Sequence, residues 1–226
     1  MQLEHLFDAS SATIVVGGTV LATLLRCGLD DCSVAVRALG GLGGRRFDAV
    51  TTRAELVGTV REIQADGVIR AEPHHFGDAE FDDATDALIG SRSIAGLHAA
   101  HIAHKRRRLD ASRRAIRTFT QAADLAPVFG LAGTLISLSQ LPAGTGNGGD
   151  FTTAISMAVL TTLYGLLLGN IVFAPLARMV ARVSSAEERE RQAVLEWLEQ
   201  QVEGAMPKAQ PAHFVRERHT LEQHVS

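Results

Sequence analysis

Residues Phe151 to Ala177 read FTTAISMAVLTTLYGLLLGNIVFAPLA, 27 positions without a Lys, Arg, His, Asp or Glu. Crossing a hydrocarbon core of about 30 Å takes about 20 helical residues, so this stretch is long enough to span a bilayer. Two more apolar stretches occur, SATIVVGGTVLATLL from Ser11 to Leu25 and LAPVFGLAGTLISLSQL from Leu125 to Leu141. The sequence therefore predicts three transmembrane helices.

The basic residues are sorted along the chain. All 22 Lys and Arg residues lie between Arg26 and Arg117 or after Ala177. Cytoplasmic segments of membrane proteins carry the excess of Lys and Arg, which orients the predicted spans in a bacterial inner membrane. The chain is predicted to be an all-α, multi-pass membrane protein with four parts: a periplasmic start and first span (1–25), a helical cytoplasmic domain (26–124), a channel-forming transmembrane hairpin (125–177), and a cytoplasmic helix and tail (178–226).

Composition and motifs exclude several classes of function. The net charge of −3 argues against nucleic acid as the main partner. No P-loop, nucleophile elbow or metal-ligand set occurs, so neither an enzyme nor a cofactor is predicted. His98, His101 and His104 recur every three positions, but successive steps of three drift around a helix and no acidic or cysteine ligand accompanies them, so no metal site is predicted. Cys27 and Cys32 are predicted to be free thiols in a reducing cytoplasm.

Hydroxyl groups are the polar side chains that an ion could meet inside the predicted spans. Thr134, Thr161 and Thr162 are the candidates for an ion pathway, because bare ions are costly in hydrocarbon. No carboxylate lies within the spans, and Asp124 and Asp150 lie only at their ends. The chain is therefore predicted to need a partner that supplies an ionisable group.

Small residues and prolines shape the predicted hairpin. Gly130 and Gly133, with Gly165 and Gly169 on the other helix, are spaced to let two membrane helices approach closely. Pro127 suits the first turn of a helix, where a missing N–H costs nothing.

Pro175 lies late in the third span and is predicted to kink it near the cytoplasmic face. As a hypothesis, Pro127 and Pro175 couple ion passage to motion of the cytoplasmic domain.

Three motifs together resemble the MotA/TolQ/ExbB proton channel family. They are AVLTTLYGLLLGNIVFAPLA (158–177), DLAPVFGLAGTLISL (124–138) and IVVGGTVLATLL (14–25), and the resemblance covers about residues 10–180. Tyr164, with the Asn and Phe that follow it, makes the last span more similar to MotA-type flagellar stator subunits than to TolQ or ExbB.

The resemblance implies an ion-conducting subunit, for H⁺ or Na⁺, that couples ion flow to torque in the flagellar motor. It implies a homo-oligomeric ring, expected to be a pentamer, around a MotB-like single-span partner that brings an Asp into the membrane. It also places Thr134 and Thr162 on the pore.

Two features depart from the MotA pattern. MotA-type subunits have four spans and only three are predicted here, so the start of the sequence is expected to be truncated, misassigned or shortened. In the cytoplasmic domain, Gly67 and Glu72 match positions implicated in rotor contact, but Gln64 stands where an Arg is expected. Arg61 and Arg70 lie near it, so Glu72, Arg61 and Arg70 are the predicted contacts with a rotor protein.

Two other functions remain open on the sequence. A TolQ/ExbB-type energiser would share the channel and differ in its partner. A degenerate, non-conducting membrane scaffold is also compatible with the missing span and with Gln64.

Overall fold

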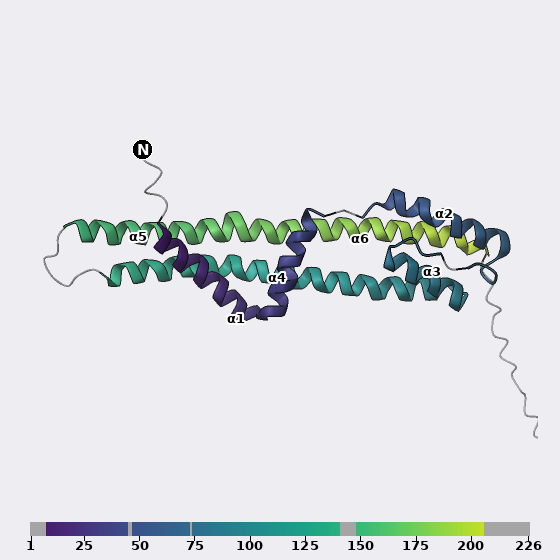
Figure 1. Cartoon of the computed structure of the whole chain (residues 1–226), viewed down its shortest axis with the longest axis horizontal. Coiled ribbons are helices and arrows are strands. Elements are labelled where there is room, and N and C mark those ends of the chain that lie inside the picture. Colours follow the sequence, from purple (N-terminus) through teal and green to yellow (C-terminus); the bar gives the residue numbers. More distant parts are fainter. Residues whose placement is uncertain (1–7, 45–46, 73, 141–147, 206–226) are drawn as a thin grey trace, which may run out of the picture.

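The computed structural model describes residues 8–44, 47–72, 74–140 and 148–205 of the 226-residue chain. Every described element is a helix, which confirms the predicted fold class. Two long antiparallel rods run side by side along the molecule (Figure 1). One rod is α4, and the other is the continuous run of α5, the π-helical segment η2, and α6. The elements are α1 (Ala9–Leu42), α2 (Ala49–Asp66), α3 (Ala79–Ser91), α4 (Ile94–Ser139), α5 (Gly148–Leu167), η2 (Leu168–Phe173), α6 (Ala174–Val202) and η3 (Glu203–Ala205).

Among the described residues, three helical runs are long and apolar enough to cross a membrane. They lie in α1, in α4 and in the run from Phe151 to Ala205, which confirms the three predicted transmembrane helices. At 1.5 Å per residue, the 46 residues of α4 extend about 70 Å, more than twice the hydrocarbon thickness. Each rod therefore continues from the membrane into the cytoplasmic part without a break.

Helix α1 is bent at Gly28. This residue has φ 84° and ψ 162°, a backbone conformation that favours glycine, and it divides α1 into two straight segments. Asp8 caps the first segment, because its carboxylate accepts a hydrogen bond of 2.8 Å from the Ser11 N–H. The first segment runs obliquely past the two rods, and the second crosses them at a steeper angle (Figure 1).

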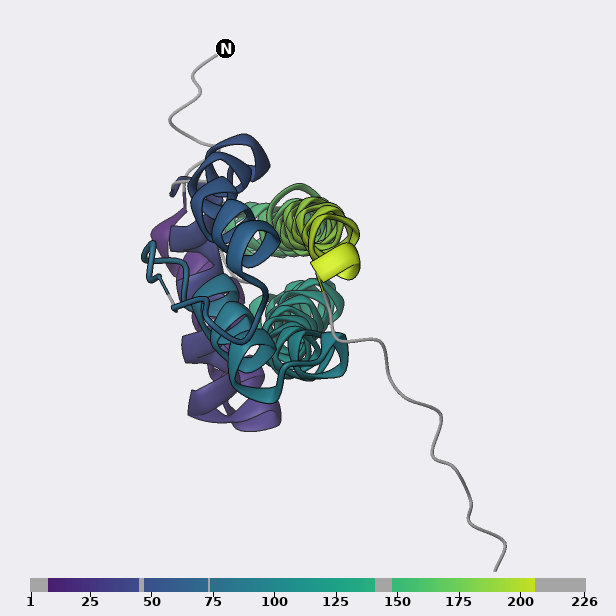
Figure 2. The ribbon, with the colours of Figure 1, turned by 90° about the vertical axis from the view of Figure 1, so that its right-hand side faces the viewer.

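The short helices α2 and α3 lie together on one side of the rods at the cytoplasmic end (Figures 1 and 2). Gly67, with φ 78°, ends α2. The apolar core that joins these helices to α4 and α6 is formed by fully buried side chains of all four: Leu56, Ile63, Leu88, Leu97, Leu195 and Leu198. Burial of apolar surface thus holds the cytoplasmic end together.

Candidate functional site

The seam between α4 and α5 is built from glycines. A Cβ added at Gly165 would lie 2.6 Å from the Ala126 carbonyl oxygen and 2.9 Å from the Gly130 Cα. A Cβ added at Gly133 would lie 2.8 Å from the Thr161 methyl carbon. Only glycine permits this backbone separation, because any Cβ would clash. Close packing is needed here, since lipid provides no hydrophobic drive between helices.

Thr134 of α4 and Thr162 of α5 meet across this seam. Their Oγ1 atoms are 2.7 Å apart. Thr134 also donates to its own helix, at the Gly130 carbonyl 3.0 Å away, and lies 3.2 Å from the Ala158 carbonyl. The two hydroxyls are partly buried and lie on an open groove of ≈ 420 Å³ between α4 and α5, whose other lining residues are apolar: Leu138, Ile155, Ala158, Val159, Leu163 and Leu166. The structure thus brings two of the three predicted ion-pathway threonines into direct contact.

Thr161 lies elsewhere. It is fully buried, its hydroxyl donates to the Ala158 carbonyl at 3.0 Å, and its methyl group faces Gly133. This placement makes Thr161 part of the contact between the helices, and it does not line the groove.

Pro127 does not lie in the first turn of a helix, so that prediction is wrong. The end of the cytoplasmic domain and the second span form one helix, α4, and Pro127 lies in its interior. Without an N–H at Pro127, the Ala123 carbonyl loses its usual helical donor. That carbonyl lies against Gly169, where an added Cβ would be 2.7 Å from the oxygen.

The second rod changes its helical type at the same level. Residues Leu168–Phe173 form the π-helical segment η2, and the Ala174 N–H bonds to the Gly169 carbonyl. Pro175 follows in the first turn of α6, where it has no N–H to offer. Of the two predicted coupling prolines, Pro127 therefore lies beside the first turn of the π-helical segment and Pro175 directly follows its end.

Tyr164 joins α5 to the start of α1. Its hydroxyl accepts a hydrogen bond of 3.1 Å from the Asp8 N–H. Further along α1, Gly18 lies against the Phe129 ring of α4, which an added Cβ would meet at 2.3 Å. Helix α1 thus contacts both helices of the hairpin.

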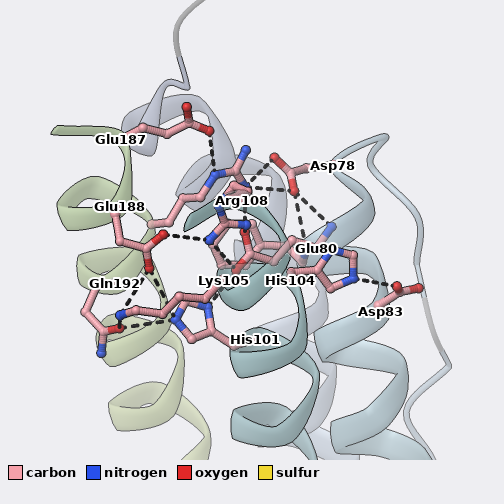
Figure 3. A network of polar contacts seen from close by, with 12 residues as sticks. Asp78, Glu80, Asp83, His101, His104, Lys105, Arg108, Glu187, Glu188 and Gln192 are labelled. Atoms are coloured by element: carbon pink, nitrogen blue, oxygen red, sulfur yellow. Dashed lines mark hydrogen bonds and ion pairs between the residues drawn. The ribbon is translucent and has the colours of Figure 1, made fainter. Parts of the chain in front are cut away.

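A network of charged side chains joins α3, α4 and α6 in the cytoplasmic part (Figure 3). At its centre is Glu80, which is 3% exposed. Its carboxylate pairs with Arg108 and lies 2.8 Å from the Arg191 Nη1 and 2.6 Å from the His101 Nδ1. The remaining pairs surround this centre: Arg191 with Asp78 and Glu187, Arg108 and Lys105 with Glu188, and His101 with Gln192.

The charges of this network shift the pKa values of its members. Burial would raise the pKa of Glu80, but the contacts with His101 and Arg108 and the charges of Arg108 and Arg191 outweigh it and lower this pKa to about 2. Burial would lower the pKa of Arg191, but its hydrogen bond to Glu187 and the carboxylates of Asp78 and Glu80 raise it. Glu80 and Arg191 are therefore ionised at neutral pH.

The three histidines at the predicted spacing have separate partners. His98 lies 3.3 Å from Glu199, His101 pairs with Glu80, and His104 lies 2.8 Å from Asp83. Within the described ranges, no group of three or more His, Cys, Asp or Glu side chains could hold a metal ion. The thiols of Cys27 and Cys32 are free, as predicted.

The predicted rotor contacts lie at the far cytoplasmic end. Arg61, in α2, and Arg70 and Glu72, after it, are exposed. Gln64, which stands at the expected Arg position, donates to the Gln201 carbonyl at 2.8 Å and so ties α2 to the end of α6. The three charged residues remain free to meet another protein.

Sequence reasoning missed the buried charge network. The missed residues are Glu80, Arg108 and Arg191. Helical periodicity gives one signal, since Arg108 and His101 are seven residues apart and so share a face of α4. Their partners come from α3 and α6, which only the tertiary fold brings together.

The comparisons with known proteins agree with this architecture. Residues 84–193 match the model of the MotA/TolQ/ExbB proton channel family. The chain is 29% identical over 196 residues to motility protein A of Cereibacter sphaeroides, covering 84% of this chain and 76% of the relative. It is 25% identical over 193 residues to chemotaxis protein PomA of Vibrio alginolyticus, covering 84% and 75%.

A solved structure of the flagellar MotAB stator complex from Bacillus subtilis has the same fold, with a TM-score of 0.77 at 19% identity over 89% of this chain and 81% of that one. The matched residues 84–193 contain the membrane hairpin and the α4 and α6 members of the charge network, so this part of the chain is similar to the MotA/TolQ/ExbB proton channel family domain.

Proposed function

We propose that this chain is an ion-conducting subunit of the flagellar stator, which couples the flow of H⁺ or Na⁺ to torque together with a MotB-like partner. One observation carries the proposal: within a proton channel family domain, a membrane hairpin presents two touching hydroxyls, Thr134 and Thr162, on an open apolar groove. The names of the relatives, motility protein A and PomA, favour the stator over the TolQ/ExbB-type energiser.

The groove can assist an ion but cannot exchange a proton alone. The hydroxyls of Thr134 and Thr162 can accept a cation or relay a hydrogen bond, but neither titrates near neutral pH. None of the described residues that line the groove carries a carboxylate. A single-span partner helix that seats a carboxylate beside the two hydroxyls would complete the path, and several copies of this chain would enclose it.

The two rods would transmit a shift of the helices at the groove to the cytoplasmic part. Because α4 and the run from α5 to α6 are continuous, a shift at the groove moves their cytoplasmic ends as well. The layer of Pro127, Pro175 and the π-helical segment is the proposed site of that shift, since helical hydrogen bonding is weakest there. Arg61, Arg70 and Glu72 at the far end are the proposed rotor contacts.

The test is to remove each hydroxyl while keeping the side-chain volume. Thr134→Val and Thr162→Val, expressed with the partner in cells lacking the native subunit, are expected to lower ion flux and swimming about tenfold, equivalent to about 1.4 kcal/mol in a barrier. Thr→Ser at each position should restore most of the flux. Thr13→Val is the matched control, because Thr13 is exposed on α1 and bonds only to its own helix at the Ala9 carbonyl.

Valine variants that assemble and conduct like the unmodified protein would sink the proposed role of the hydroxyls. The partner separates the two channel functions: a peptidoglycan-binding single-span protein recovered with the chain supports the stator, and a TolR- or ExbD-like protein supports the energiser. Normal assembly without any ion flux in the unmodified chain would indicate a scaffold.

A further inference from the structure

Both ring nitrogens of His101 face oxygen acceptors from other helices (Figure 3). The Nδ1 atom lies 2.6 Å from a carboxylate oxygen of Glu80, on α3. The Nε2 atom lies 3.2 Å from the amide oxygen of Gln192 and 4.0 Å from a carboxylate oxygen of Glu188, both on α6. Because His101 is only 2% exposed, its nitrogens depend on these protein partners. The side chain therefore joins α3 and α6 to α4.

The amide of Gln192 is held with its oxygen toward His101. Its NH₂ group donates to the Glu196 carboxylate at 3.2 Å, and the Lys105 ammonium donates to its oxygen at 3.4 Å. Turning the amide over would place donor against donor at Lys105 and acceptor against acceptor at Glu196. Gln192 can therefore accept a hydrogen bond from His101 but cannot donate one.

These contacts require a proton on each ring nitrogen of His101. A nitrogen without a proton presents a lone pair, which would face a carboxylate oxygen at 2.6 Å or an amide oxygen at 3.2 Å. Neutral imidazole carries one N–H group, whereas imidazolium carries two. The geometry therefore requires the imidazolium form, a buried cation.

The charges around His101 require the same form. Among the described residues, the network joins four carboxylates to three cations: Asp78, Glu80, Glu187 and Glu188 with Lys105, Arg108 and Arg191. A charged His101 balances the fourth carboxylate, and an unbalanced charge is costly at a buried site. Charged groups nearby on the same helices and on α2 have separate partners: His98 with Glu199, His104 with Asp83, and Arg53 with the Ala193 carbonyl.

We propose that His101 is a proton sensor of the cytoplasmic part: when charged it joins α6 to α4, and loss of its proton releases α6 at Gln192. A neutral ring can keep its Nδ1–H toward Glu80, which Arg108 and Arg191 hold in place. Its Nε2 lone pair then faces the amide oxygen of Gln192 and repels it. Histidine ordinarily changes charge between about pH 5 and pH 8, so this release responds to the pH of the cytoplasm. The proposal goes beyond ion conduction and does not require it.

The first experiment reads the protonation state directly. The full-length chain is labelled with ¹⁵N-histidine, assembled with its partner in phosphatidylethanolamine–phosphatidylglycerol vesicles, and recorded by solid-state NMR across the neutral pH range. The signals absent from His101→Gln, or from His101→Lys if the first variant does not assemble, belong to His101. At about pH 7, where an ordinary histidine is mostly neutral, they should be the two N–H resonances of an imidazolium. By about pH 9 one nitrogen should have lost its proton.

Two NMR results would overturn the proposal. A neutral ring at about pH 7 would show that His101 is not the cation that the contacts require. Two N–H resonances that persist at about pH 9 would show a permanent charge, which cannot act as a sensor.

The second experiment follows the stability of the assembled protein. The folded chain holds a proton that the unfolded chain releases above about pH 6.5, so the stabilisation is fully present below that pH and falls as the pH rises. Between about pH 6.5 and pH 8.5 the melting temperature should fall by about 2–4 °C more in the unmodified chain than in His101→Gln. His104→Gln is the matched control, because its partner Asp83 is 63% exposed, and it should keep the fall. Equal slopes in the unmodified chain and His101→Gln would contradict the sensor.

Hydrogen exchange locates the release. After correction for the intrinsic rate, exchange in α6 should rise over the same pH range, while exchange in α3 stays constant. A rise confined to α3 would place the lost contact at Glu80 and overturn the assignment to Gln192. None of these readouts depends on ion flow, so failure of the proposed function would leave them unchanged.

Discussion

Helix α4 makes two contacts of opposite kinds with the second rod. In the membrane part it meets α5 through glycines, with Gly130 and Gly165 so close that a Cβ would strike backbone atoms. In the cytoplasmic part it meets α3 and α6 through a buried carboxylate, Glu80, held by Arg108 and Arg191. One helix thus changes its mode of association along its length.

The difference follows from the solvent on each side. Lipid offers no hydrophobic gain, so close packing and hydrogen bonds must hold α4 to α5. In water, apolar burial holds the cytoplasmic helices, and a charge can be buried among them only if it is paired. The membrane contact depends on close packing of backbones, whereas the ionic contact is directional and holds α3 and α6 against α4 through paired charges.

Removing the charge of Glu80 is expected to have the largest effect. Glu80→Gln leaves Arg108 and Arg191 without their shared counter-charge at a buried site, which should destabilise the cytoplasmic part by about 3–5 kcal/mol. Loss of thermal stability and increased proteolysis of the purified subunit would show it. An unchanged melting temperature would mean that Asp78, Glu187 and Glu188 suffice for the two arginines.

A methyl group in the glycine seam is expected to have the next largest effect. Gly165→Ala places a Cβ 2.6 Å from the Ala126 carbonyl, a backbone atom that cannot move aside alone. Such overpacking should cost about 1–3 kcal/mol and reduce assembly of the complex in detergent, measured by size-exclusion chromatography and thermal melting. Gly17→Ala is the matched control on α1, because an added Cβ there meets nothing within 4 Å. Equal behaviour of the two variants would contradict the close-packed seam.

Acid should weaken the ionic contact and spare the glycine seam. The pKa of Glu80 falls from an ordinary value of 4.5 to about 2 in the folded protein, so its stabilisation is fully present above pH 4.5 and is lost as the pH falls toward 2. Between pH 7 and pH 4 the loss should be about 1 kcal/mol. Melting curves across this range should show this loss in the unmodified chain and a smaller one in Glu80→Gln. The same slope in both would assign the acid sensitivity to other groups.

The membrane part could be predicted from sequence more fully than the cytoplasmic part. Hydropathy and the placement of Arg26, Arg117 and Arg178 located the spans, since both signals are local. Pro127 was misplaced because the sequence rule for proline describes isolated helices. Here the long rod continues through it, and its freed carbonyl lies against Gly169.

In the candidate site, too, the features that depend on tertiary contacts could not be predicted from the sequence. The spacing of Thr161 and Thr162 could not show which hydroxyl faces the groove, because that depends on how α5 is rotated against Gly133. Glu80 gave no signal because an acidic residue in the first turn of a helix is ordinary at a surface. Its burial depends on Arg108 and Arg191, which are 28 and 111 positions away.

The exposed pair between Asp83 and His104 gives the smallest expected effect and the sharpest control on the cytoplasmic contact. Like Glu80 and His101, it joins a carboxylate of α3 to a histidine of α4, here at 2.8 Å, but the Asp83 side chain is 63% exposed. Water already solvates this carboxylate, so Asp83→Asn should change the stability by only about 0.2–1 kcal/mol. The melting temperatures of Asp83→Asn and Glu80→Gln, measured at low and high salt, separate the effect of burying a carboxylate from the effect of pairing it with a histidine. A large, salt-resistant loss in Asp83→Asn would mean that the histidine–carboxylate pairs themselves hold α3 to α4. A small, salt-sensitive loss assigns that role to the arginines that enclose Glu80.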